Sequence, residues 1–210
     1  MECLDQIEHK GFNIKIHQDE LCHESPRDWD NLGTMALFHR RYDLGDNDHN
    51  LDIEDVKRIV ETGKLDGEDV VFLPVYGLDH SGFTINTSGF SCPWDSGQLG
   101  IIFVTKSKIL KEYGWKILTA KRREKIREYL RNEVNTYNDY LTGNVYGYEI
   151  ETEDGEHFDS CWGFYGDYND YMIPECKAII DSHIEHKRAQ TELLWYRLEN
   201  SLLEYVEFLR

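Results

Sequence analysis

The chain has 210 residues, of which 40% are hydrophobic and 13% aromatic, so it can bury a sizeable core and is not expected to be disordered. Its formal net charge of −17 argues against direct binding to nucleic acid, because contacts to phosphates need clustered lysine and arginine. Apolar runs stay well short of the roughly 20 residues that cross a membrane, and the opening MECLDQIEHK lacks the features of a signal peptide. We expect a cytoplasmic protein without membrane contacts.

No cofactor and no metal are expected from the sequence. The five cysteines are scattered and form no C-x-x-C pair, which predicts reduced thiols rather than a disulfide framework or a zinc site. A calcium loop that starts at Asp46 fails because Leu51 replaces the required glycine. His183 and His186 are spaced to share a metal on a helix, but no third ligand is identifiable. Dinucleotide and P-loop glycine patterns do not occur.

The first third of the chain predicts strands and one helix. Apolar and polar residues alternate in GFNIKIHQ (11–18), and the apolar TMALFHRRY (34–42) follows a turn-like segment, so a strand is expected in each. A helix is expected from about Asp52, with Gly63 as its end.

The middle of the chain predicts a buried sheet. Two strands joined by LDHS are expected within residues 70–88, and Pro74 would place the first at an edge or a bulge. The continuous apolar run LGIIFVT (99–105) predicts a strand that is buried on both faces. The preceding WDSG (94–97) is interpreted as the turn that starts this strand, since Asp and Ser before Gly bond their own backbone.

Two long helices are expected in the second half. The first runs from about Thr119 to Gly143, and the second runs from Pro174 to Arg210, either unbroken or divided at KRAQ (187–190). The last turns carry a broad apolar stripe, which is expected to dock on the chain's own sheet, with a helix-mediated dimer as the alternative. The stripe consists of Leu194, Leu198, Leu202, Tyr205, Val206 and Leu209.

Together these elements predict a single α+β domain over residues 1–210. Its sheet is expected to be mixed or antiparallel, with about five to seven strands, and to pack with three or four helices, including a long C-terminal one. A subdivision into a sheet-rich part, 1–118, and a helix–hairpin–helix part, 119–210, is the alternative.

The segment 144–166 predicts a hairpin whose apolar pattern selects the loop length. A three-residue loop, 153–155, keeps the apolar residues of both strands on one face, whereas a two-residue loop separates them. These apolar residues are Tyr146, Tyr148, Ile150, Phe158, Trp162 and Phe164. The same register sets Glu149 opposite Asp159 on the other face. Such a carboxylate face is either solvated or covered by a hard cation or a basic surface.

Asp79, His80 and Asp95 are the candidate acid and base groups if the chain is an enzyme. An acyl-transfer site is not favoured, because a G-x-S-x-G motif is missing from the sequence and Ser96 directly follows Asp95.

Arg27, Trp29, Arg40 and Trp94 form a candidate ligand site. The arginines would hold an anion such as a nucleotide phosphate, and the indoles would stack on a base. The alternative is that these arginines pair with the nearby acids Asp28, Asp30 and Asp43.

Three stretches resemble an uncharacterised protein family found in bacteriophages and bacterial mobile elements. They are ESPRDWDNLGTM with HRRYDLGD (24–46), DHSGFTINTSGFSCPWDSGQLG (79–100), and YLTGNVYGYEI with DSCWGFYG (140–166). They cover somewhat more than a third of the chain. The resemblance implies a small accessory protein of a phage or mobile element, and it carries over no activity and no catalytic residue.

The leading functional hypothesis is an acidic, non-enzymatic viral protein that inhibits a host defence protein. It would act as a DNA mimic in the host cytoplasm, as a monomer or homodimer, by occupying a basic surface that binds nucleic acid. Residues 132–176 support this, since they hold acidic residues but no Lys or Arg. The expected partner-binding residues are Glu149, Glu151, Glu153, Asp154, Glu156 and Asp159. The alternatives are a small hydrolase or nucleotide-acting enzyme that uses Asp79, His80 and Asp95, and a protein that sequesters a nucleotide.

Overall fold

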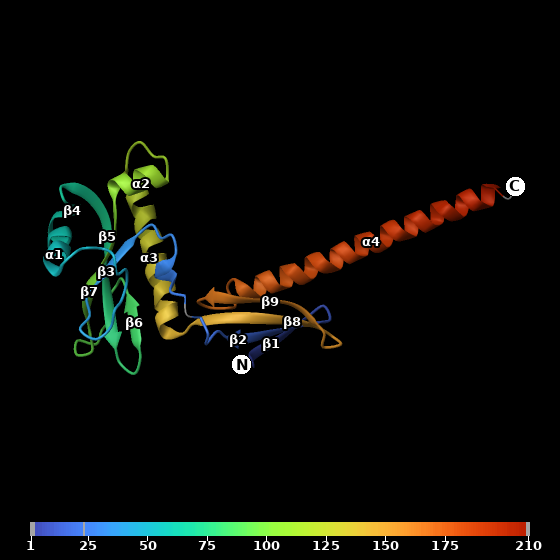
Figure 1. Cartoon of the computed structure of the whole chain (residues 1–210), viewed down its shortest axis with the longest axis horizontal. Coiled ribbons are helices and arrows are strands. Elements are labelled where there is room, and N and C mark those ends of the chain that lie inside the picture. The colour runs from blue at the N-terminus through green and yellow to red at the C-terminus, as the bar shows by residue number, and fades with distance from the viewer. Residues whose placement is uncertain (1–2, 23, 209–210) are drawn as a thin grey trace. The chain divides into compact units, whose positions relative to one another are not determined.

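The computed structural model describes residues 3–22 and 24–208, with side chains up to residue 200. It confirms the predicted α+β class, with nine strands in two antiparallel sheets and four α-helices in the part of the chain that it describes (Figure 1). The strand number is slightly above the predicted range. The chain forms two compact units. We call residues 1–19 with 146–210 the terminal unit and residues 20–145 the central unit.

The terminal unit is a four-stranded sheet with one helix packed on it. Its strands, in spatial order, are β1 (Cys3–His9), β2 (Phe12–Gln18), β8 (Val145–Thr152) and β9 (His157–Tyr165). The first turns of α4 (Met172–Phe208) cover one face. Ile14 of β2 pairs with Ile150 of β8, and both are fully buried with Cys176 and Ile180 of the helix. The predicted strand within 11–18 is confirmed, whereas β1 was not predicted.

The β8–β9 hairpin has the predicted three-residue loop. The Thr152 N–H donates to the carbonyl of Glu156 at 2.8 Å, which closes the loop around residues 153–155. Gly155 has a φ of 80°, the left-handed conformation that the bulge position of such a loop requires.

α4 is one continuous helix, so the alternative of a break at 187–190 is wrong. Lys, Arg, Ala and Gln are all good helix formers, and nothing in this stretch interrupts the backbone. The prediction that the apolar stripe docks on the chain's own sheet is also wrong for Leu194 and Leu198, the two stripe residues whose side chains are described. They are 58% and 48% exposed.

The reason is the length of α4. A helix of 37 residues is about 55 Å long, roughly twice the length of an eight-residue strand, so its distal half extends past the sheet. The side chains of Leu202, Tyr205 and Val206, and the whole of Leu209, lie outside the described residues.

The central unit is built on the second sheet, with the order β3–β7–β5–β4 and with β6 paired to β5. Its strands are β3 (Thr34–Leu37), β4 (Lys64–Leu65), β5 (Glu68–Asp79), β6 (Phe83–Asn86) and β7 (Ser96–Thr105). β7 is buried on both faces, as predicted, because Ile102 and Ile101 belong to different core clusters. On one side of β5, β4 pairs with the start of the strand and β6 with its end. Pro74 lies between these two paired stretches, so β5 has a local edge at Pro74, as predicted.

Helices cover both faces of the central sheet (Figure 1). α3 (Ala120–Thr142) packs on one face and α1 (Ile53–Thr62) on the other, while α2 (Lys106–Glu112) follows β7 and the short 3-10 helix η1 (Pro26–Asp28) precedes β3. The predicted helix ends are confirmed, since Asp52 and Thr119 cap the first turns and Gly63 and Gly143 end the helices with φ of 69° and 72°. α3 packs on this sheet and therefore belongs to the central unit. The central unit accordingly ends at residue 145 and not at residue 118, where the alternative subdivision placed the boundary.

The guanidinium of Arg27 forms the main buried ionic contact of the central unit. The side chain is 4% exposed and donates to both carboxylate oxygens of Asp46, at 2.7 and 2.9 Å, and to Glu133 of α3 at 3.1 Å. Asp46 also accepts the N–H of Met35, and Glu133 accepts two N–H groups from the loop before β3. Burial acts to lower the pKa of Arg27, but the bonds and charges of the two carboxylates outweigh it and raise that pKa. The charged guanidinium therefore joins η1, the loop after β3, and α3.

We expect Arg27→Ala to lower the free energy of unfolding by about 3–5 kcal/mol, because it leaves two nearly buried carboxylates without their cation. Arg58→Ala is the control, since Arg58 is 56% exposed and its ion pair with Asp55 should contribute less than about 1 kcal/mol. Urea denaturation of both variants measures the difference. Equal losses would contradict the structural role of Arg27.

A second ionic contact fixes α4 to the β1–β2 turn in the terminal unit. Asp181 Oδ1 lies 2.9 Å from Lys10 Nζ and 2.7 Å from His9 Nε2. The hydrogen bonds from Lys10 and from His9 lower the pKa of Asp181 below its usual value.

Because this pKa is lower in the folded state, Asp181 stabilises the fold at pH values above about 4, and its contribution is lost as the pH falls through the lowered pKa. We expect Asp181→Asn to be less stable than wild type at about pH 6 and to approach it at about pH 2. Denaturation of both proteins across this range tests the sign. If the difference in free energy of unfolding between the two proteins grows towards acidic pH, the predicted role of Asp181 is contradicted.

Candidate functional site

Several strand ends of the central sheet meet at one hollow. Antiparallel pairing sets Asp79, the last residue of β5, opposite Phe83 of β6, and β7 begins beside them at Ser96. The segment after β3 reaches the same end, because Leu37 pairs with Gly100. The hollow measures about 290 Å³. We call it the edge hollow, and its lining consists of His39, Arg40, Arg41, Gly77, Asp79, Phe83, Trp94, Asp95, Ser96, Gly97 and Leu99.

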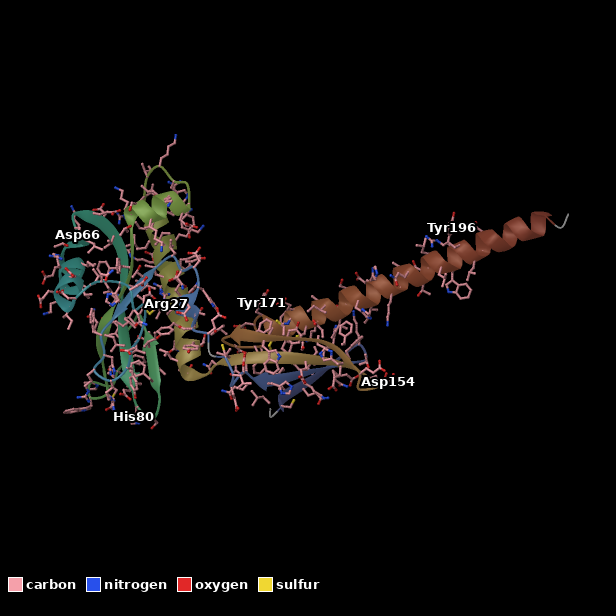
Figure 2. The ribbon with its side chains drawn as sticks, in the orientation of Figure 1. Arg27, Asp66, His80, Asp154, Tyr171 and Tyr196 are labelled. Carbon is pink, nitrogen blue, oxygen red and sulfur yellow. The ribbon has the colours of Figure 1, made fainter. Side chains whose placement is uncertain are left out.

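The three candidate acid and base groups come together at the rim of the edge hollow. His80 Nδ1 lies 3.2 Å from Asp95 Oδ2, and the Asp79 N–H donates to the Asp95 carbonyl at 2.9 Å. The Asp79 carboxylate forms an ion pair with Arg41. The His80 and Asp95 side chains are 71% and 42% exposed, and Figure 2 shows His80 at the end of the sheet. The sequence thus predicted which residues gather, and the structure shows that they do so close to solvent.

Trp94 and Arg40 line the edge hollow without an ion pair or ring contact to any residue that the structure describes. Trp94 is 91% exposed. Among the residues that the structure describes, no carboxylate lies within ion-pair distance of Arg40. An indole and a guanidinium can therefore both be offered to a ligand here.

Three rings form an aromatic cluster next to these side chains. His39 stacks on Tyr42 with ring centroids 5.0 Å apart, and Phe83 meets both rings edge-on at 5.3 and 5.4 Å. The Arg41 guanidinium lies 5.5 Å from the centre of the Tyr42 ring. This cluster holds the segment after β3 against the start of β6.

WDSG (94–97) is a turn that starts β7, as predicted. The Ser96 hydroxyl donates to the carbonyl of Cys92, and the Cys92 thiol lies 3.8 Å from Asp95 Oδ2. The hydroxyl is therefore used by the turn and is not placed as a nucleophile.

The four residues of the candidate ligand site divide between two places. Arg40 and Trp94 line the edge hollow, whereas Arg27 and Trp29 line a polar hollow of about 460 Å³ with several carboxylates. Figure 2 shows Arg27 inside the central unit, where its guanidinium is fully used by Asp46 and Glu133. Arg27 therefore does pair with acids, but these are Asp46 and Glu133 and not Asp28, Asp30 or Asp43, which were expected from the sequence.

The acidic ribbon predicted as a partner surface also divides. Glu151 accepts a 2.7 Å bond from Lys15 of β2, which raises the pKa of Lys15, and Glu149 lies 3.5 Å from the His17 imidazole. Three residues at the hairpin tip are exposed, and Figure 2 shows Asp154 there. They are Glu153, Asp154 and Glu156.

Asp159 does not lie beside Glu149 as the register predicted. It accepts a 3.1 Å bond from the hydroxyl of Tyr148, a residue of the core under α4. Burial and this bond raise the pKa of Tyr148. Phe158 also faces α4, where its ring lies 4.7 Å from that of His183. The successive side chains of Phe158 and Asp159 thus both contact core residues, which the strict alternation of the predicted pattern does not allow.

Trp162 also lies away from the predicted core face. Its ring packs over Gly147, where any Cβ would clash with it, and lies 5.8 Å from the His17 ring on the outer face of the sheet. Phe164 packs in the core under α4 after Gly163, which has a φ of 83°.

No cluster of three or more metal-ligating side chains occurs among the described residues. His183 packs against the ring of Phe12, while His186 Nε2 lies 2.8 Å from the amide of Gln190, so the two imidazoles serve separate contacts. In the described chain, no helix combines the length and apolar character of a membrane span.

Comparisons of the chain with protein-family models, curated proteins and solved structures find no match. The resemblance to a phage and mobile-element family therefore stays an expectation, and the functional argument rests on the site itself.

Sequence reasoning missed the ring cluster and the role of Arg41. The signal was present in HRRY (39–42), where two arginines are flanked by rings next to the end of a predicted strand. Its position opposite DHSGF (79–83) follows only from the pairing of β3, β7, β5 and β6.

Proposed function

We propose that the central unit binds a nucleotide, most simply a nucleoside monophosphate, in the edge hollow. The observation that carries this proposal is the pair of Trp94 and Arg40, an indole that is 91% exposed beside a guanidinium without an ion pair in the described chain. A planar group that stacks on this indole would remove apolar surface of both partners from water, which favours binding.

The two side chains match the two halves of a nucleotide. A base stacked on an indole is worth about 1–3 kcal/mol, and this contact tolerates different bases because each has a π-face. A guanidinium donates in a planar fork that fits phosphate oxygens. Trp94 would therefore take the base and Arg40 the phosphate.

The local charge of the edge hollow permits an anion although the whole chain has a charge of −17. Asp79 is neutralised by Arg41, and Asp95 lies beside His80, so the charge of Arg40 remains for the ligand. The volume of about 290 Å³ is at the lower end of ligand pockets, which suits one nucleotide rather than a dinucleotide.

The inhibitor hypothesis stays a prediction with less support. Its surface needs a coherent set of unpaired carboxylates. However, Glu151 is paired with Lys15, Glu149 lies 3.5 Å from the His17 imidazole, and Asp159 accepts a bond from the core residue Tyr148. What remains is the small acidic tip at 153–156. The edge hollow contains both an exposed tryptophan and an arginine, and this favours the nucleotide-sequestering hypothesis over the inhibitor hypothesis.

Titration with AMP, monitored by tryptophan fluorescence and calorimetry, tests the proposal. We expect Trp94→Ala and Arg40→Ala each to weaken binding by about tenfold or more, since each removes about 1–3 kcal/mol of contact. Trp195→Ala and Arg58→Ala are matched controls in exposed helical positions and should bind as wild type does. Adenosine alone should bind more weakly than AMP. Failure of AMP to bind, or equal binding by Trp94→Ala, would overturn the proposal.

A hydrolytic reaction on the bound nucleotide is the second candidate, because Asp95 holds the His80 imidazole at the rim of the hollow. In this case His80 would act as the general base towards water. We expect His80→Ala to abolish turnover of a nucleotide substrate while binding persists and stability changes by less than about 1 kcal/mol, since the ion pair is exposed. Phosphate release assays across nucleoside phosphates measure this. Turnover that survives in His80→Ala would exclude this role for the imidazole.

A further inference from the structure

The distal part of α4, residues 185–200, has no packing partner among the described residues. Every residue of this stretch is exposed. It nevertheless carries large apolar side chains, with exposed fractions between 48% and 64%. They are Leu193, Leu194, Trp195, Tyr196 and Leu198.

A helix of this kind needs a partner to be stable in water. Most of the stability of protein helices comes from packing of an apolar face rather than from intrinsic propensity. Its only recorded side-chain ion pair in this stretch, Arg188 to Glu192 at 3.0 Å, is exposed and contributes little. An apolar face of this size is therefore an association surface.

The apolar residues favour one side of the helix. Leu194 and Leu198 are four residues apart and lie on one face, and the sequence continues the same spacing with leucine at 202 and tyrosine at 205. Tyr196 lies on the opposite side, at two residues from each leucine. The face therefore extends along the helix as a continuous seam, as in a two-stranded coiled coil.

The charges beside this seam favour a second copy in the antiparallel direction. The sequence places an arginine at position 197 and a glutamate at position 204, and these two positions lie on the same flank of the helix about two turns apart. In an antiparallel pair centred near residue 200, Arg197 of each copy comes next to position 204 of the other, and Leu198 comes next to position 202. A parallel pair would place each charge beside its own equivalent and gain no such match.

We propose that two copies of this chain associate through an antiparallel pairing of their α4 helices around the Leu194–Leu198 seam. This proposal is independent of nucleotide binding, because the edge hollow belongs to the central unit and the seam to the terminal unit.

Analytical ultracentrifugation of the full chain between about 1 and 100 μM tests the association. We expect a dimer, and we expect Leu194→Glu with Leu198→Glu to raise the dissociation constant at least a hundredfold. Tyr196→Glu is the matched control, since Tyr196 is equally exposed on the other side of the helix and its change should leave the dimer intact. Circular dichroism confirms that the variants remain folded.

The direction of pairing is tested by charge reversal. We expect Arg197→Glu and Glu204→Arg each to weaken the dimer several-fold, and the double variant to restore it, because each copy then again presents opposite charges. If the two single changes raise the dissociation constant of the dimer by factors that simply multiply in the double variant, the antiparallel arrangement is overturned. A chain that stays monomeric throughout would overturn self-association and leave this face for a different protein. A dimer that is indifferent to the leucine changes would overturn the α4 seam as its interface.

Discussion

One buried guanidinium organises the central unit. Arg27 brings Asp46 and Glu133 together across about a hundred residues of sequence, and the two carboxylates bind backbone N–H groups just before β3 and within it. Since β3 leads directly into HRRY (39–42), the same contact sets where Arg40 and the neighbouring rings begin. An ion pair taken out of water needs every remaining polar atom to be satisfied, and this network meets that condition with backbone N–H groups. The edge hollow thus depends on a contact that lies outside it.

Local signals in the sequence predicted the elements well. The caps at Asp52, Thr119, Gly63 and Gly143 set the ends of both helices, and the apolar run 99–105 predicted the doubly buried β7. Features that depend on distant partners were not predictable in this way. The first is β1, which has little apolar alternation. The second is the contact of both Phe158 and Asp159 with core residues, which departs from the period of two. The third is the overhang of α4, which depends on the length of the sheet beneath it.

The same distinction applies to the candidate site. Asp79, His80 and Asp95 could be predicted together because one strand pair and its turns bring them close. It could not be predicted that Arg27 and Trp29 lie in one hollow and Arg40 and Trp94 in another, because a sequence does not state which acid each arginine contacts. Charged groups that have partners inside the chain, such as Glu149 with His17 and Glu151 with Lys15, are poor candidates for recognition. Arg40 and Trp94, which have no ion pair or ring contact with the described part of the chain, are better ones, and this contrast carries the functional argument.

The most direct measurement is a heteronuclear NMR titration of the full chain with AMP, in which the indole N–H signals of the five tryptophans report separately. If the edge hollow is the binding site, the Trp94 signal shifts progressively with AMP, together with the Arg40 side-chain signal, while those of Trp29 and Trp162 stay in place. A spectrum unchanged at millimolar AMP, or shifts confined to Trp29 or Trp162, would contradict the account.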